Sequence, residues 1–592
     1  MKRSRKRTLG VAAGLVVVAG AFYGCEDFLV SPPQGTLDEL TLANRAGVEA
    51  TLIGAYRLLG GWTPGLGAWG AAASNWSFGS VPSDDAYKGS DPADQAPITD
   101  LELYNWGLAG AESYLNDKWR SVYEGVTRTN ATLRLLNRVL EERPGDISEA
   151  DASSIRGEAL FLRAHYHFEA WKMWQNIPYY TEEDTDFRKP NAGVDPVPLI
   201  LADLDEAIAL LPPTHRNGQK GRVHAWTARA YKGRVQVYSG DYAGGLTTLR
   251  DVVSSGRYAL EPNSQRVWSA IPANANGPET ILAYQASAND GNPDGDNANY
   301  GERLNFPHAG SPFGCCGFHQ PSQNLVNFFG VDDDGLPIAL SNPSWNASDE
   351  NLTASSDVPV DPRLDWTVGR DGVPYKDWPS NPEVEGIHRP SWIRDRGWAG
   401  PYSGKKNVHE FSSNAQSNVG WNAQHLNSMN IHLYRYADLL LLLAEAEVEA
   451  GVPDNARQIV NQIRERAGVA AQGPGTSVAT MAVPIDAPSI TWANYRIGLY
   501  TAPWDQNFAR TAVRYERRLE LAMEGHRFFD LRRWGIAEQV LNDYVAVERT
   551  RRAYLGGAAA VTDRHQLWPI PAVQIELSRV ANEDRLQQNP GW

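Results

Sequence analysis

The chain has 592 residues and a formal net charge of −15 at neutral pH. This acidic balance argues against nucleic acid and against an anionic lipid surface as partners. Only three cysteines are present, so a disulfide framework is excluded and stability has to come from core burial, which a chain of this size can supply. Trp (20) outnumbers Phe (15), a balance that favours rings with a polar handle and a flat face suited to interfaces.

Residues 1–24 predict a lipoprotein signal peptide. A basic head spans 2–7, and an apolar run from Leu9 to Tyr23 is too short for a bilayer, which needs about 20 residues. Gly24 then precedes Cys25, the place where such a signal is cut and the thiol is acylated. We expect a lipid on Cys25 to hold the mature chain on a membrane outside the cytoplasm. An ordinary signal peptide with an incidental cysteine is the alternative.

Helical patterns follow in close pairs. They span 39–59, 111–142, 152–174 and 198–211, then 223–239 with 242–255, and 436–450 with 453–467. Small residues and short Gly-Asp or Gly-x-Pro-Asp turns join the pairs, and each unit is near the 34 residues of a tetratricopeptide repeat. The sequence therefore predicts a mainly α fold in which repeat helix pairs form a superhelix.

Residues 262–430 differ from these helices. They are rich in Gly, Asn, Asp, Pro and Trp, and a short strand is expected over 280–284. We interpret them as an irregular, loop-rich insertion, a natural place for a binding surface. The expected organisation is an N-terminal region over 25–270, the insertion over 271–430 and a C-terminal region over 431–592.

Aromatic side chains beside polar ones suggest a sugar-binding surface. The loop over 60–106 also holds Trp62, and it sets several rings next to carboxylates. Sugars need rings to stack on and polar groups that bind hydroxyls. The candidate ligand-binding residues are Trp69, Trp76, Asp84, Asp85, Tyr87 and Trp106 from this loop, with Tyr300, Phe313 and Phe318 from the insertion. Core packing of the same rings is the alternative.

Two further motifs lie in the insertion. Cys315 and Cys316 are adjacent, which permits a vicinal disulfide near the binding site, with free thiols as the alternative. Asp290, Asn292, Asp294 and Asp296 follow the first half of a calcium loop, so Ca²⁺ is the one cofactor considered. The twelfth position is Gly301 rather than Glu, and a solvated acidic turn is the alternative.

Several segments resemble the SusD/RagB family of outer-membrane lipoproteins. The most specific is Glu516–Ala522 followed by Glu524–Gly535, which reads EGHRFFDLRRWG. The others are CEDFL from Cys25, RYADLL from Arg435, NQIRERAG from Asn461, LWPIP from Leu567 and QNPGW at the end. These matches run from the signal peptide to the last residue.

The resemblance implies a role as well as a fold. Such a protein would sit lipid-anchored in the outer membrane, face the exterior, and capture a nutrient, usually a glycan, for a SusC-like TonB-dependent transporter. A peptide ligand, as in the RagB branch, and a surface glycan hydrolase are the alternatives. We expect no catalysis, because the charged residues over 516–534 suit a structural ion-pair network across helices.

Overall fold

The computed structural model describes residues 39–62, 65, 69–379, 386–421, 425–472, 481–488 and 490–592. The predicted signal peptide and Cys25 lie outside these residues. None of the helices in the described ranges has the length and apolar character needed to cross a membrane.

The helices and strands have the following bounds. The helices are α2 (Glu39–Leu42), α3 (Arg45–Arg57), α4 (Ala96–Glu102), α5 (Ala109–Glu142), α6 (Glu149–Trp174), α7 (Pro196–Leu210), α8 (Ala225–Tyr238), α9 (Tyr242–Ser254), α10 (Ser264–Val267), α11 (Gln323–Phe328), α12 (Leu364–Thr367), α13 (Arg396–Ala399), α14 (Tyr436–Ala450), α15 (Pro453–Ala467), α17 (Gln506–Leu521), α18 (Arg527–Arg533), α19 (Ala537–Arg551) and α20 (Ala572–Leu577). The strands are β1 (Ala86–Gly89), β2 (Thr280–Tyr284), β3 (Phe318–Pro321), β4 (Pro359–Val360), β5 (Val368–Gly369), β6 (Ser403–Gly404), β7 (Ile431–Arg435), β8 (Ala471–Gln472), β9 (Ala482–Val483) and β10 (Asn494–Tyr495).

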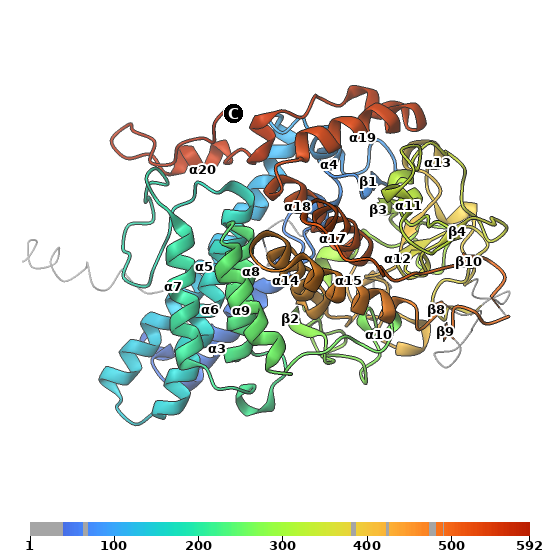
Figure 1. The fold of residues 1–592 in the computed structure, drawn as a ribbon. Helices are drawn as coiled ribbons and strands as arrows, with labels where there is room; N and C mark the ends of the chain where they lie inside the picture. Colours follow the sequence, from blue (N-terminus) through green and yellow to red (C-terminus); the bar gives the residue numbers. More distant parts are fainter. Residues whose placement is uncertain are drawn as a thin grey trace, which may run out of the picture.

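Helices α5 to α9 pack in succession, and α9 packs on α14, which contacts both α15 and α17 (Figure 1). Close crossings explain the small residues noted in the sequence. A Cβ on Gly125 would lie 2.6 Å from the Tyr166 ring, and one on Gly233 would lie 2.4 Å from Leu249. The apolar run Leu439–Leu443 of α14 is buried all round. The mainly α fold expected from the helix pairs is confirmed.

The irregular part lies beside this helical part and is tied to it by short strands (Figure 1). Strand β2 pairs antiparallel with β7, which runs directly into α14. Strand β1 pairs antiparallel with β3, with Tyr87 opposite Gln320. This second pairing joins the loop over 60–106 to the insertion, so the two segments expected to bind a ligand are neighbours in space.

Charged side chains between β7, α15 and α17 form a buried ion-pair network. Arg435 contacts Glu279 at 2.7 Å and both Glu520 and Glu524 at 2.8 Å. Arg363 adds contacts to Glu520 and to its neighbours. We define the network as Glu279, Arg363, Arg435, Arg466, Glu516, Glu520 and Glu524. These pairs confirm the structural interpretation of the charged residues over 516–534.

Candidate functional site

Most of the aromatic side chains expected at the ligand surface lie in the core. Trp76, Tyr87, Trp106, Phe313 and Phe318 are almost completely buried. Trp106 stacks on Trp568 with ring centroids 3.6 Å apart, and Trp76 packs edge-on against Phe318. Their expected role as exposed platforms is therefore wrong in this structure, because other rings already cover their faces.

The carboxylates Asp84 and Asp85 are also internal. Arg527 contacts Asp84 at 2.7 Å, and Arg518 contacts Asp85 at 3.0 Å. Burial alone would raise the pKa of Asp84, but the charges of Arg518 and Arg527 lower it to about 2. These carboxylates connect the N-terminal loop to α17 and α18 and are not available to sugar hydroxyls, which corrects the expectation for both.

Two of the expected aromatic residues reach the surface. Trp69 and Tyr300 are half-buried. Trp69 packs against the main core, with its carbonyl accepting a hydrogen bond from Ser77. Tyr300 instead stacks on Trp62, with ring centroids 4.4 Å apart and an angle of 17° between the planes. Of the nine expected ligand-binding residues, Tyr300 is the one in an arrangement suited to a saccharide.

This pair extends into a longer stack. The guanidinium carbon of Arg303 lies 4.7 Å from the centre of the Tyr300 ring and 4.3 Å from the Trp421 ring. At the other end, the Arg57 guanidinium lies 5.5 Å from the Trp62 ring. We call Arg57, Trp62, Tyr300, Arg303 and Trp421 the aromatic stack. Trp421 is 59% exposed, so one face of its indole is open to solvent.

Buried residues hold the stack in place. Tyr300 starts a single 3₁₀ turn, Tyr300–Glu302. The Trp76 indole donates to the carbonyl of Gly301 at 3.2 Å, and the Ser74 amide donates to Glu302 at 3.2 Å. Arg57 donates to the Trp62 carbonyl at 3.0 Å. Trp76 is therefore a positioning residue beneath the stack rather than a ligand contact.

The electrostatics beneath the stack are unusual. Burial raises the pKa of Glu302 to about 7, although hydrogen bonds from Ser74 and Asn305 oppose the shift. Burial lowers the pKa of the Arg303 guanidinium. Among the residues that the structure describes, Arg303 makes no ion pair within 4.0 Å.

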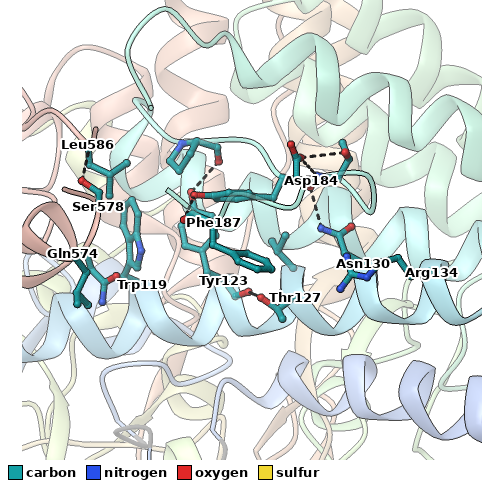
Figure 2. Close-up of a pocket in the computed structure, with 15 residues that line it drawn as sticks. Trp119, Tyr123, Thr127, Asn130, Arg134, Asp184, Phe187, Gln574, Ser578 and Leu586 are labelled. Carbon is teal, nitrogen blue, oxygen red and sulfur yellow. Dashed lines mark hydrogen bonds between the residues drawn. The ribbon is translucent and has the colours of Figure 1, made fainter. Parts of the chain in front are cut away.

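Cavities border the candidate site on one side and lie elsewhere along α5. A cavity of about 370 Å³ adjoins the stack at Arg57 and is also lined by Tyr284, Asp290 and Asn297. A second cavity, of about 190 Å³, lies where Trp119 and Tyr123 of α5 meet the C-terminal segment (Figure 2).

The second cavity was not expected from the sequence. Phe187 at its rim is 67% exposed and Leu577 is 66% exposed. Its tyrosine hydroxyls already donate to backbone carbonyls, Tyr123 to Pro178 at 3.0 Å and Tyr180 to Phe187 at 2.8 Å. These walls leave fewer free polar groups for sugar hydroxyls, so the aromatic stack is the stronger candidate site.

The Cys315 and Cys316 sulfurs are bonded to each other in the structure. A ring nitrogen of His425 lies within 4.8 Å of both sulfurs. Burial lowers the pKa of His425 to about 4, and Arg303 adds to this shift, so the imidazole is neutral. The bonded pair thus lies on the inner side of the aromatic stack, where the sequence had suggested it.

The calcium-loop motif folds as a series of Asx turns. Asp290 accepts a hydrogen bond from the Asn292 amide at 3.1 Å, and Asn292 accepts one from Asp294 at 2.9 Å. In the described ranges, the group of side chains that brings potential metal ligands together is Cys315, Cys316 and His425, and not Asp290, Asp294 and Asp296. Calcium binding by this loop stays a prediction.

The residues that the sequence did not single out are Arg303 and Trp421. Trp421 lies between Gly420 and Asn422, a context typical of an exposed loop ring, and this was the available signal. Arg303 carried no signal, because its significance depends on partners that it lacks.

Comparison with known proteins agrees with the fold. Residues 278–592 match the model of the SusD family, and residues 73–237 match a model described as "starch-binding associating with outer membrane". SusD-like protein P38 of Formosa agariphila is 23% identical over 554 residues, which cover 90% of this chain and 93% of the relative.

Two solved structures have the same fold. A SusD superfamily protein from Bacteroides vulgatus has a TM-score of 0.65 at 20% identity, covering 94% of this chain and 100% of its own. Surface glycan-binding protein A from Bacteroides thetaiotaomicron, in complex with laminarihexaose, has a TM-score of 0.62 at 17% identity, covering 92% of this chain and 99% of its own. With more than half of its length matched by the family model, the chain belongs to the SusD family.

Proposed function

We propose that this protein is a non-catalytic, glycan-binding lipoprotein of the outer membrane that passes its ligand to a SusC-like TonB-dependent transporter. The aromatic stack carries the binding part of this proposal. Three separate loops place Trp62, Tyr300 and Trp421 in one array with an open indole face. A sugar ring stacks on such a face through its C–H groups, while nearby polar groups take its hydroxyls.

Two relatives support a glycan as ligand. One structural neighbour, with a TM-score of 0.61, is described as a laminarin-binding SusD-like protein, and another was solved with laminarihexaose. Laminarin is therefore the first probe for this chain. The family description "associating with outer membrane" and the motif at Cys25 support the proposed location.

Binding is tested with the soluble form that begins at Glu26. We expect it to be retarded by one or more polysaccharides in affinity electrophoresis, starting with laminarin. Trp421→Ala removes the open ring and should weaken binding by about 2 kcal/mol, roughly 30-fold, as for a central aromatic contact. Trp226→Ala is the matched control, because Trp226 on α8 is also half-buried beside an arginine, 5.1 Å from Arg229.

The result has two ways to contradict the proposal. Equal losses in the two variants would mean that the stack does not bind the ligand. Release of shortened sugars from a retained polysaccharide would mean that the protein is a hydrolase.

The anchor and the partner are tested in cells. Mass spectrometry of the processed protein should find acyl chains on Cys25, and Cys25→Ala should release the protein from the membrane fraction. The full-length lipidated chain, extracted in mild detergent, should co-purify with a TonB-dependent transporter; recovery without one would remove that part of the proposal.

A further inference from the structure

Arg303 differs from the other fully buried arginines of this protein. It is 1% exposed, yet it has no carboxylate partner among the described residues. The other arginines in the same class are Arg370, Arg435, Arg464 and Arg517, which contact Asp365 at 2.7 Å, Glu279 at 2.7 Å, Glu516 at 2.9 Å and Asp438 at 2.6 Å. A buried cation without a counter-charge is costly, so Arg303 needs an explanation.

The free atoms of Arg303 are two nitrogens on one edge of the guanidinium. Nε and Nη2 are both buried, and neither has a hydrogen-bond partner. The two flanking rings stabilise the charge through their faces, but such a contact contributes only about 2 kcal/mol when desolvated, and it leaves the N–H groups unsatisfied. The edge of the guanidinium is therefore still able to donate two hydrogen bonds.

The same pair of atoms binds carboxylates elsewhere in this chain. Nε and Nη2 of Arg370 donate to Asp365 at 2.7 and 2.8 Å. Those of Arg527 donate to Asp84 at 2.7 and 2.9 Å. A two-point contact of this kind is what a planar guanidinium offers to a carboxylate, a sulfate or a phosphate.

We propose that Arg303 binds an anionic group on the glycan, either the carboxylate of a uronic acid or a sulfate ester, through Nε and Nη2. This inference rests on the proposed function and names its substrate class. The anion enters along the edge of the guanidinium between Tyr300 and Trp421. Trp421, the exposed ring of the two, tilts to admit it while the sugar keeps its contact with the indole.

Three monosaccharides separate the charge from the sugar ring. Glucose, glucuronate and glucose 6-sulfate share a ring and differ at C6, and their binding is followed by tryptophan fluorescence and by ligand-observed NMR. We expect at least one acid to bind about tenfold more tightly than glucose at low salt, with the preference shrinking as salt rises. The acid that is preferred identifies the carboxylate or the sulfate as the anion.

Two variants assign the preference to Arg303. Arg303→Gln should remove the difference between acid and glucose, and Arg303→Lys should keep part of it as a point charge. Arg564→Gln is the control, since Arg564 lies 4.6 Å from the Trp592 ring, is exposed, and should leave the preference intact. Thermal melts of each variant show that it is folded.

The outcomes separate this inference from the proposed function. If wild-type protein binds glucose and the acids equally, or none of the three, the role of Arg303 is overturned. A preference that survives in Arg303→Gln overturns it too. Retention of a neutral polysaccharide in those cases leaves glycan binding by the stack intact, whereas failure to retain any polysaccharide overturns both.

Discussion

Buried arginines are used in opposite ways in two regions of this molecule. In the ion-pair network, Arg435 donates to carboxylates on three sides, and each partner comes from a helix, a strand or their immediate flanks. In the aromatic stack, Arg303 lies between two rings and meets no carboxylate among the described residues. The first arrangement is complete within the protein and stabilises the fold. The second keeps donors in reserve, which is typical of a binding site.

The largest effect is expected from breaking the network. Arg435→Met removes the cation from between Glu279, Glu520 and Glu524 and leaves buried carboxylates uncompensated. Loss of one partner of a buried pair costs about 3–5 kcal/mol, which a urea unfolding curve would show as a lower midpoint.

A surface pair gives the control for that variant. Arg579 lies 2.8 Å from Asp584, with both side chains more than two-fifths exposed, and Arg579→Met should cost less than about 1 kcal/mol. Equal losses in the two variants would contradict the distinction between the network and ordinary surface pairs.

A smaller effect is expected from the carboxyl group beneath the stack. The pKa of Glu302 is about 7 in the folded protein, above its ordinary 4.5, because burial disfavours the carboxylate. Its contribution to folding stability is therefore fully present below pH 4.5 and is lost as the pH rises through 7. At about 1.4 kcal/mol per pKa unit, the loss is on the order of 3 kcal/mol.

Glu302→Gln should flatten this part of the pH–stability profile, measured by urea unfolding between those limits. The exposed Glu576→Gln should leave the slope unchanged. The network has the opposite sign, because its arginines lower the pKa of Glu520 against the effect of burial, and its contribution is lost as the pH falls. An unchanged slope in Glu302→Gln would show that this carboxyl is already ionised.

The smallest effect is expected from calcium. The oxygens of Asp290 and Asn292 are occupied by backbone amides of the turn, so millimolar Ca²⁺ should leave the melting temperature unchanged, and a chelator should do the same. A clear rise with Ca²⁺ would establish a metal site beside the cavity at Arg57 and would add a second kind of compensation to the loop side of the comparison.

Sequence reasoning identified the helices better than the site. The bounds of α14 and α15 follow directly from local apolar periodicity and from the Gly451 turn. Composition could not separate core rings from surface rings, since Trp62 and Trp106 occur in the same loop and only distant partners tell them apart. Trp106 meets Trp568 from the far end of the chain, whereas Trp62 meets Tyr300. Contacts across hundreds of residues leave no periodic signal in the chain.

The stack of Trp106 on Trp568 also has a consequence for the order of folding. Trp174 donates to the carbonyl of Pro569, and the Asn589 amide group donates to the carbonyls of Trp174 and Trp568. The N-terminal core is thus closed by residues that the ribosome adds last. A nascent chain cannot finish this core before release, and so it exposes Trp106 and Trp174 throughout synthesis, which makes protection by a chaperone a condition of its biogenesis.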